Sequence, residues 1–237
     1  MTPAEAKRGF SGDPVAERGW GRDRSCNAFV FGYGSLVDRR DVSTFWRRLG
    51  KRPAAMFDAE LPGFRREWNV AMDNTRDLAG YKSYTDMRGR RPTYVAFLNV
   101  MPAAMGRSVN GLCFAVDRDM LAALDGRERN YERIDVSAAI RPSVAGPVWC
   151  YVGSRDALAR FKRGVEGATA VIAAAYRDQV HGAFKANGVG AYKQYLATTA
   201  ESPLPVLELI RHEVPSLRPR TGPRPSPEPV SLTDQAT

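Results

Sequence analysis

A short segment after an apolar run has the residue types that could hold an anion. Ala28 to Phe31 are apolar, and Gly32-Tyr33-Gly34-Ser35-Leu36 follows directly. This pattern is typical of a buried strand whose chain bends sharply where it emerges. Because glycine has no side chain, a ligand can approach the main chain there, and N–H groups around Ser35 and Leu36 can converge on one oxygen. The pattern therefore predicts a cradle for a carboxylate or an oxyanion, although a plain strand-to-loop bend would use the same glycines.

A second segment, Leu124-Asp125-Gly126-Arg127-Glu128, could supply an acid or base. Asp117 is a suitable helix cap, and Met120, Leu121 and Leu124 have the spacing of one buried stripe, so a short helix is expected to present Glu128 at its end. A glutamate in this position can move protons. The alternative is a solvated ion pair with Arg127 or Arg129, which carries no function.

Together, the two segments resemble the gamma-glutamylcyclotransferase-like family, over about residues 28 to 200. In that family a Tyr-Gly-Ser-Leu loop holds the gamma-glutamyl group, and a glutamate in a Leu-Asp-x-Arg-Glu segment handles protons. The resemblance implies that Glu128 is the catalytic residue. It also implies a set of substrate-binding residues: Tyr33, Gly34, Ser35, Leu36 and Tyr131.

The reaction implied by the resemblance turns a gamma-glutamyl amide into 5-oxoproline and releases an amino acid, peptide or amine. The substrate's own amine attacks its side-chain carbonyl, so the enzyme must accept a proton, stabilise an oxyanion and protonate the departing nitrogen. No metal or organic cofactor is expected, and the partner is a small gamma-glutamyl molecule. The alternative on the same scaffold is a non-catalytic gamma-glutamyl-binding module. The leaving group is left open.

The order of apolar segments predicts an α+β domain, because strands and helices do not alternate regularly. The resemblance implies more, namely a small closed or nearly closed β-barrel flanked by helices, with the ligand at its mouth. A helix is expected over 41–49, and two helices are expected later. Their stripes are Ile172, Tyr176, Val180 and Phe184 in the first and Val189, Tyr192 and Leu196 in the second. Strands are expected over 28–32, 54–60, 64–70, 93–100, 109–116, 131–140 and 147–152.

Composition restricts the class of protein. The chain of 237 residues is 43% hydrophobic, which suits one folded domain, and it contains no apolar run as long as a membrane span. The N-terminus lacks the apolar core of a secretory signal. The three cysteines are scattered and only two histidines are present, so neither a disulfide framework nor a zinc site is expected. These features predict a cytoplasmic protein.

The net charge of +9 suggests a different class of function. Basic residues crowd the segment from Arg39 to Arg66, and a basic face can bind nucleic acid. No ribonucleoprotein motif, helix-turn-helix pattern or zinc finger accompanies them, so a solvated basic surface is the preferred interpretation.

Three regions are expected along the chain. Residues 1–26 are interpreted as a flexible leader, 27–212 as the gamma-glutamylcyclotransferase-like domain, and 213–237 as a disordered proline-rich tail. Residues 73–92 are polar and basic with two glycines, which predicts a long surface insertion. Either a plain variable loop or a lid that meets the far end of the substrate fits this pattern.

Overall fold

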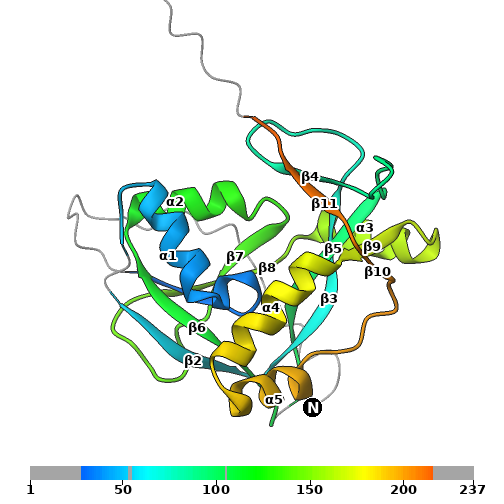
Figure 1. The fold of residues 1–237 in the computed structure, drawn as a ribbon. Coiled ribbons are helices and arrows are strands. Elements are labelled where there is room, and N and C mark those ends of the chain that lie inside the picture. Colours follow the sequence, from blue (N-terminus) through cyan, green and yellow to red (C-terminus); the bar gives the residue numbers. More distant parts are fainter. Residues whose placement is uncertain (1–27, 53–54, 105, 216–237) are drawn as a thin grey trace, which may run out of the picture.

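The computed structural model describes residues 28–52, 55–104 and 106–215. The predicted leader lies outside the described residues, and so does the predicted tail from residue 216 onward. Within the described part (Figure 1), the strands are β1 (Ala28–Gly32), β2 (Met56–Pro62), β3 (Phe64–Asp73), β4 (Lys82–Thr85), β5 (Tyr94–Pro102), β6 (Ser108–Val116), β7 (Tyr131–Asp135), β8 (Val148–Gly153), β9 (Ala170–Ala173), β10 (Val206–Leu207) and β11 (Ile210–Glu213). The helices are α1 (Arg39–Arg48), α2 (Arg118–Arg127), α3 (Arg155–Glu166), α4 (Ala174–Ala186) and α5 (Val189–Thr198), with a 3-10 turn, η2, at Ser35–Val37.

The strands form sheets of five, four and two strands. Their orders are β2-β6-β1-β8-β7, β10-β9-β5-β3 and β11-β4. This mixture of sheets and helices confirms the predicted α+β class. Among the described strands, no hydrogen-bonded ladder joins the two larger sheets into a closed barrel. Polar side chains link them instead: the Gly153 N–H donates to Asn99 Oδ1 (2.8 Å), and Arg66 Nη2 donates to Asn110 Oδ1 (3.0 Å).

Strand β1 lies inside the five-stranded sheet, antiparallel to β6 and parallel to β8. Phe31 packs in the larger core cluster and Val30 packs in a second cluster beneath α1 and α2. Both faces of the strand are therefore buried, which explains a continuous apolar run in place of an alternating one. The strand carries the chain from the core directly into the glycine-containing turn.

Helices α1 and α2 cover the sheet on the side of Val30. The Asp38 carboxylate caps α1 by accepting the N–H groups of Arg40 and Asp41, which is why the helix begins two residues before the predicted start. Asp117 caps α2 as predicted, and its carboxylate accepts the Met120 N–H. The predicted stripe of α2 is buried, so Glu128 follows the helix at a fixed position.

Two elements have other bounds than predicted, and one helix was not predicted. The strand expected over 131–140 stops at Asp135, because the Asp135 carboxylate accepts the Ser137 N–H (2.9 Å) and turns the chain. In the region expected to be helical, Ile172 belongs to strand β9, so α4 starts later. Helix α3 was not predicted, although Ser154 caps it by accepting the Ala157 N–H.

The buried face of α5 also differs from the prediction. Val189 and Leu196 are 74% and 49% exposed, whereas Tyr195 is buried at 1%. Tyr195 stacks on Phe184 of α4, with ring centroids 4.4 Å apart. The predicted stripe therefore placed Val189 and Leu196 in the core, whereas the helix buries Tyr195.

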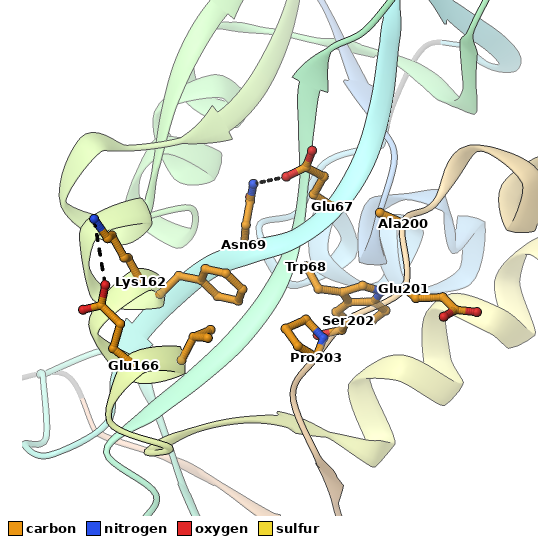
Figure 2. Close-up of a pocket in the computed structure, with 11 residues that line it drawn as sticks. Glu67, Trp68, Asn69, Lys162, Glu166, Ala200, Glu201, Ser202 and Pro203 are labelled. Carbon is orange, nitrogen blue, oxygen red and sulfur yellow. Dashed lines mark hydrogen bonds and ion pairs between the residues drawn. The ribbon is translucent and has the colours of Figure 1, made fainter.

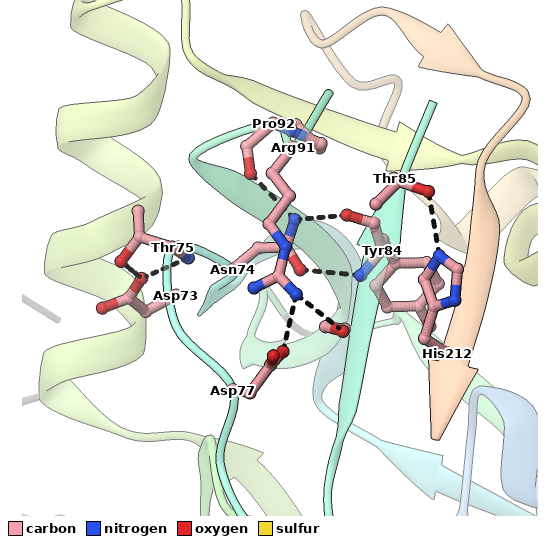
Figure 3. Close-up of polar contacts among 10 residues, drawn as sticks. Asp73, Asn74, Thr75, Asp77, Tyr84, Thr85, Arg91, Pro92 and His212 are labelled. Atoms are coloured by element: carbon pink, nitrogen blue, oxygen red, sulfur yellow. Dashed lines mark hydrogen bonds and ion pairs between the residues drawn. The ribbon is translucent and has the colours of Figure 1, made fainter. Parts of the chain in front are cut away.

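Residues 73–92 are exposed at 75–80 and 87–91, as a surface segment was predicted to be, but they also contain a strand and buried side chains that were not predicted. Strand β4 pairs antiparallel with β11, whose residues lie more than a hundred positions later, and Tyr81 and Tyr84 are buried. The Asn74 side chain holds the segment together, as Figure 3 shows: its amide donates to the carbonyls of Tyr84 and Pro92 (both 2.9 Å) and accepts the Tyr84 N–H (2.8 Å). The segment is a packed lobe of the domain.

The end of the domain is bonded to the same lobe. The Val214 N–H donates to the Tyr81 carbonyl (2.7 Å), and the Gly80 N–H donates to the Val214 carbonyl (3.0 Å). Glu213, placed in the tail from sequence, is therefore the last residue of β11, and Val214 is bonded to the lobe. None of the helices in the described ranges is both long and apolar enough to cross a membrane.

Candidate functional site

The structure brings the six predicted site residues around one small cavity. Tyr33, Gly34, Ser35 and Leu36 of the turn line it together with Glu128 and Tyr131. The remaining lining residues are Phe31, Gly32, Leu98, Tyr151 and Tyr176. Segments that are far apart in the sequence therefore meet at the end of β1. The roles of these residues stay predictions.

The two glycines of the turn are required by close packing. A Cβ atom on Gly32 would lie 2.5 Å from Cβ of Leu36, which is closer than two carbons can come. A Cβ atom on Gly34 would lie 3.0 Å from the Tyr176 hydroxyl. The neighbours of the turn therefore leave little or no room for a side chain at either position, which glycine satisfies.

The turn presents main-chain donors. The 3-10 turn is closed by the Val37 N–H, which donates to the Gly34 carbonyl (3.0 Å). Among the residues that the structure describes, no backbone carbonyl accepts the N–H groups of Gly34, Ser35 or Leu36. Polar groups of this kind require a partner, and three successive donors on a cavity wall suit an anion.

Glu128 is held by its main chain and mostly enclosed. Its N–H donates to the Leu124 carbonyl (2.8 Å), and its carbonyl accepts the Tyr131 N–H (2.9 Å). Its side chain is 16% exposed, and Oε1 lies 3.2 Å from Nε of Arg127. The ion pair considered from sequence is therefore present, but the side chain lines the cavity and is mostly buried.

Arg127 contacts both Glu128 and the turn. Besides its ion pair with Glu128, its Nη2 lies 3.4 Å from Oγ of Ser35, and its guanidinium lies 5.4 Å from the centre of the Phe45 ring. A cation between the carboxylate and the turn adds positive charge where an anionic ligand would bind.

Four of the eleven residues that line the cavity are tyrosines. The Tyr33 hydroxyl donates to the Tyr151 carbonyl (2.6 Å), and the Tyr131 hydroxyl donates to the Leu98 carbonyl (2.8 Å). These bonds fix both rings. Burial raises the pKa of both hydroxyls, and the negative charge of Glu128 raises each pKa further, so both stay protonated at neutral pH.

Tyr176 was interpreted from sequence as a packing residue, and it does pack, edge-on, against Trp68 and Phe97. It also lines the cavity, and burial followed by the charge of Glu128 raises its pKa. Tyr176 is therefore a lining residue of the same cavity as the turn and Glu128, a position that was not predicted from sequence. No sequence motif identifies this tyrosine, because it belongs to α4, which lies outside the two segments that resemble the family.

A buried arginine, Arg66, is hydrogen-bonded to the main chain of the turn. Arg66 has no exposed surface, and its Nε donates to the Tyr33 carbonyl (2.9 Å). Its other nitrogens donate to Oγ1 of Thr198 (2.8 Å) and to the Asn110 main-chain carbonyl and side chain. Burial lowers its pKa to about 9. Its assignment to a basic surface was wrong, because its side chain is buried and makes four hydrogen bonds to buried oxygens.

Other members of the predicted basic face have acidic partners. Arg39 lies 2.7 Å from Asp58, and Lys51 lies 2.7 Å from both Asp117 and Asp119. These contacts neutralise part of the charge that suggested nucleic-acid binding.

No three His, Cys, Asp or Glu side chains among the described residues gather to hold a metal ion. Cys113 and Cys150 are buried and free, and burial raises the pKa of Cys113 to about 12, so neither thiol is a reactive thiolate. His181 contacts Tyr192, and His212 contacts Thr85.

Larger hollows exist elsewhere. One of about 350 Å³ lies beside Trp68 and Phe161 (Figure 2). Two of its three acids have partners: Glu67 accepts a hydrogen bond from Asn69 (2.7 Å), and Glu166 lies 3.9 Å from Lys162. Size alone does not identify a site, and this hollow lacks the combination of a mostly buried carboxylate and main-chain donors.

Comparison with known proteins finds distant similarity to solved structures. No family model matches the chain, and no curated protein matches it. A structure described as gamma-glutamyl cyclotransferase is 14% identical over 75% of this chain and 90% of its own, with a TM-score of 0.47. The uncharacterized human protein loc79017 is 15% identical over the same shares, with a TM-score of 0.44. A yeast gamma-glutamyl cyclotransferase specific to glutathione is 13% identical over 55% of this chain and 70% of its own, with a TM-score of 0.36. At these scores we base the functional proposal on the geometry of the site.

The packing of the turn leads to a testable prediction. Gly34→Ala should leave the protein folded but reduce its activity at least tenfold, because the new methyl group pushes against the Tyr176 hydroxyl and displaces the cavity wall. Tyr176→Phe removes the atom that the methyl group meets. The double variant should therefore recover part of the lost activity, measured as kcat/KM. A double variant no more active than Gly34→Ala would show that this contact does not shape the site.

Proposed function

We propose that this protein is a gamma-glutamylcyclotransferase, which converts a gamma-glutamyl amide to 5-oxoproline and releases the amine. The single observation that supports this most is the position of the mostly enclosed Glu128 carboxylate in one cavity with the main-chain donors of residues 34–36. A proton acceptor and an oxyanion cradle are the two devices that the reaction needs.

Glu128 would carry out both proton steps. It accepts a proton from the substrate's α-amine as the nitrogen attacks the gamma-carbonyl carbon and a new C–N bond closes the five-membered ring. It then gives this proton to the departing nitrogen as the original amide C–N bond breaks. The proton count balances, and water takes no part. This chemistry needs no metal or organic cofactor.

The turn would hold the substrate and the developing charge. The N–H groups of Gly34, Ser35 and Leu36 bind the substrate's α-carboxylate or the oxygen of the tetrahedral intermediate. Tyr33 and Tyr131 wall the cavity and keep water out, and Tyr131 orients the glutamyl group. We further propose that the two larger sheets together act as a nearly closed barrel with the ligand at its mouth.

The second candidate function is a non-catalytic gamma-glutamyl-binding module. The ion pair between Arg127 and Glu128 favours it, because it gives the carboxylate a structural role that needs no reaction. Both functions use the same cavity, so they differ only in turnover.

The experiment that decides between them is an assay of the purified protein with a panel of gamma-glutamyl compounds. The panel contains amino-acid, peptide and amine amides, and 5-oxoproline is the product measured. Release from at least one compound is expected. Stabilisation of the protein against heat by these compounds without any 5-oxoproline would contradict the enzyme and support the binding module.

A further inference from the structure

Lys82 is a cation close to the candidate site that the proposed reaction does not use. It belongs to β4, and its Nζ lies 4.2 Å from the centre of the Phe97 ring and 5.6 Å from that of Tyr81. Phe97 packs edge-on against Tyr176, with centroids 4.9 Å apart, and Tyr176 lines the cavity. The ammonium group is therefore one aromatic ring away from the cavity wall.

Bonds to the residues after Glu128 hold the segment that carries Lys82. Arg129 Nη2 donates to the Ala79 carbonyl (3.2 Å), and the Arg129 guanidinium lies 5.0 Å from the centre of the Tyr81 ring. Asn130 Nδ2 donates to the Tyr81 hydroxyl (2.9 Å). The segment is thus bonded to the two residues that follow Glu128.

The charge of Lys82 lacks an anionic partner. Among the described residues, no carboxylate lies within ion-pair distance of its Nζ. Burial lowers its pKa to about 8. The more distant charges of Glu128 and Glu213 favour the protonated form, and those of Arg211 and Arg127 oppose it. A partly buried cation without an anionic partner is costly, and an anion that binds beside it would offset this cost.

We propose that Lys82 binds a carboxylate on the departing amine of the substrate, so that the site prefers gamma-glutamyl amino acids to gamma-glutamyl amines that lack this group. The proposal rests on the proposed function. The donors of residues 34–36 serve the glutamyl end of the substrate, and Glu128 must reach both nitrogens. We place the departing group toward Lys82, because the segment that carries Lys82 is bonded to the residues directly after Glu128.

The test compares gamma-glutamyl-alanine with gamma-glutamyl-ethylamide, whose departing groups differ only by the carboxylate. In Lys82→Met, kcat/KM for the alanine compound should fall about ten- to a hundredfold, mainly through KM, since a charged hydrogen bond is lost. The value for the ethylamide should change less than threefold. Lys185→Met is the matched control, because Lys185 also lies over an aromatic ring, that of Tyr192 (5.1 Å), and both values should be unchanged.

Two further measurements separate binding from a structural role. Lys82→Arg keeps the charge and should retain part of the preference for the alanine compound. In the unaltered protein, the ratio of the two kcat/KM values should fall as the pH rises above about 8, where Lys82 loses its proton. Ionisation of the substrate's α-amine cancels in this ratio, since both compounds share it.

Equal losses for both compounds in Lys82→Met, or an unchanged preference, would overturn the role of Lys82. Absence of turnover of either compound by the unaltered protein would instead overturn the proposed function. In that case, calorimetric binding of the two compounds decides the matter. Tighter binding of the alanine compound that is lost in Lys82→Met would support a carboxylate site at Lys82, and equal binding of the two compounds would overturn it.

Discussion

Replacing Glu128 by glutamine is expected to lower the rate of 5-oxoproline release by about 10² to 10⁴-fold, because the amide keeps the shape of the side chain but cannot accept a proton. The fold should be retained, since the side chain makes one ion pair, with Arg127, and its main-chain bonds do not change. The measurement is kcat at saturating substrate, with the melting temperature recorded for each variant.

Glu132→Gln is the matched control for this experiment. Glu132 lies four residues further along, in β7, and its side chain is exposed. Its replacement should leave kcat within a factor of about two, because surface substitutions rarely affect a distant site. Near-full turnover in Glu128→Gln would mean that another group accepts the proton, and the mechanism assigned to Glu128 would be wrong.

Replacing Arg66 by leucine should cause the largest loss of stability, about 2 to 4 kcal/mol, because several buried oxygens lose their donors at once. These oxygens belong to Tyr33, Asn110 and Thr198. The cation also lies over the Phe184 ring (4.7 Å). For a domain of this size, the melting temperature should fall by roughly 5 to 15 °C.

The neighbouring residue provides the control. Arg65 is exposed and forms an ion pair with Glu67, so Arg65→Leu should change stability by less than about 1 kcal/mol. Thermal unfolding of the two variants side by side makes the comparison. Similar melting temperatures would contradict the view that Arg66 supports the turn through the Tyr33 carbonyl.

Local sequence signals predicted the elements that position the site. The apolar run before Gly32 is a strand, Asp117 does cap a helix, and that helix does end at Glu128. In each case the cause is local: a run of apolar side chains, a capping carboxylate or an apolar stripe. This is why the turn and the candidate base could be named without coordinates.

Features that depend on distant pairing could not be predicted in the same way. Tyr151 lines the cavity because β8 runs parallel to β1, with Cys150 opposite Phe31. No local pattern in either strand encodes this register. The lobe at residues 73–92 was misinterpreted for the same reason, since β4 is completed by β11 from the end of the domain.

Arg66 was misplaced because composition does not distinguish a buried arginine from a surface one. Its neighbours in sequence are charged, yet in a strand successive side chains point to opposite faces, and Arg65 is exposed while Arg66 is not. The closed or nearly closed barrel implied by the resemblance likewise depends on long-range pairing. Among the described strands, the two larger sheets share no ladder and are linked by side chains such as Asn99.

The most direct measurement is a crystal structure of the Glu128→Gln variant with gamma-glutamyl-alanine bound. We expect the gamma-carbonyl oxygen or the α-carboxylate within hydrogen-bond distance of the N–H groups of residues 34–36. The α-amine and the amide nitrogen should both lie beside the side chain at position 128. A ligand bound in the hollow beside Trp68, or one whose nitrogens face away from position 128, would contradict this account of the site.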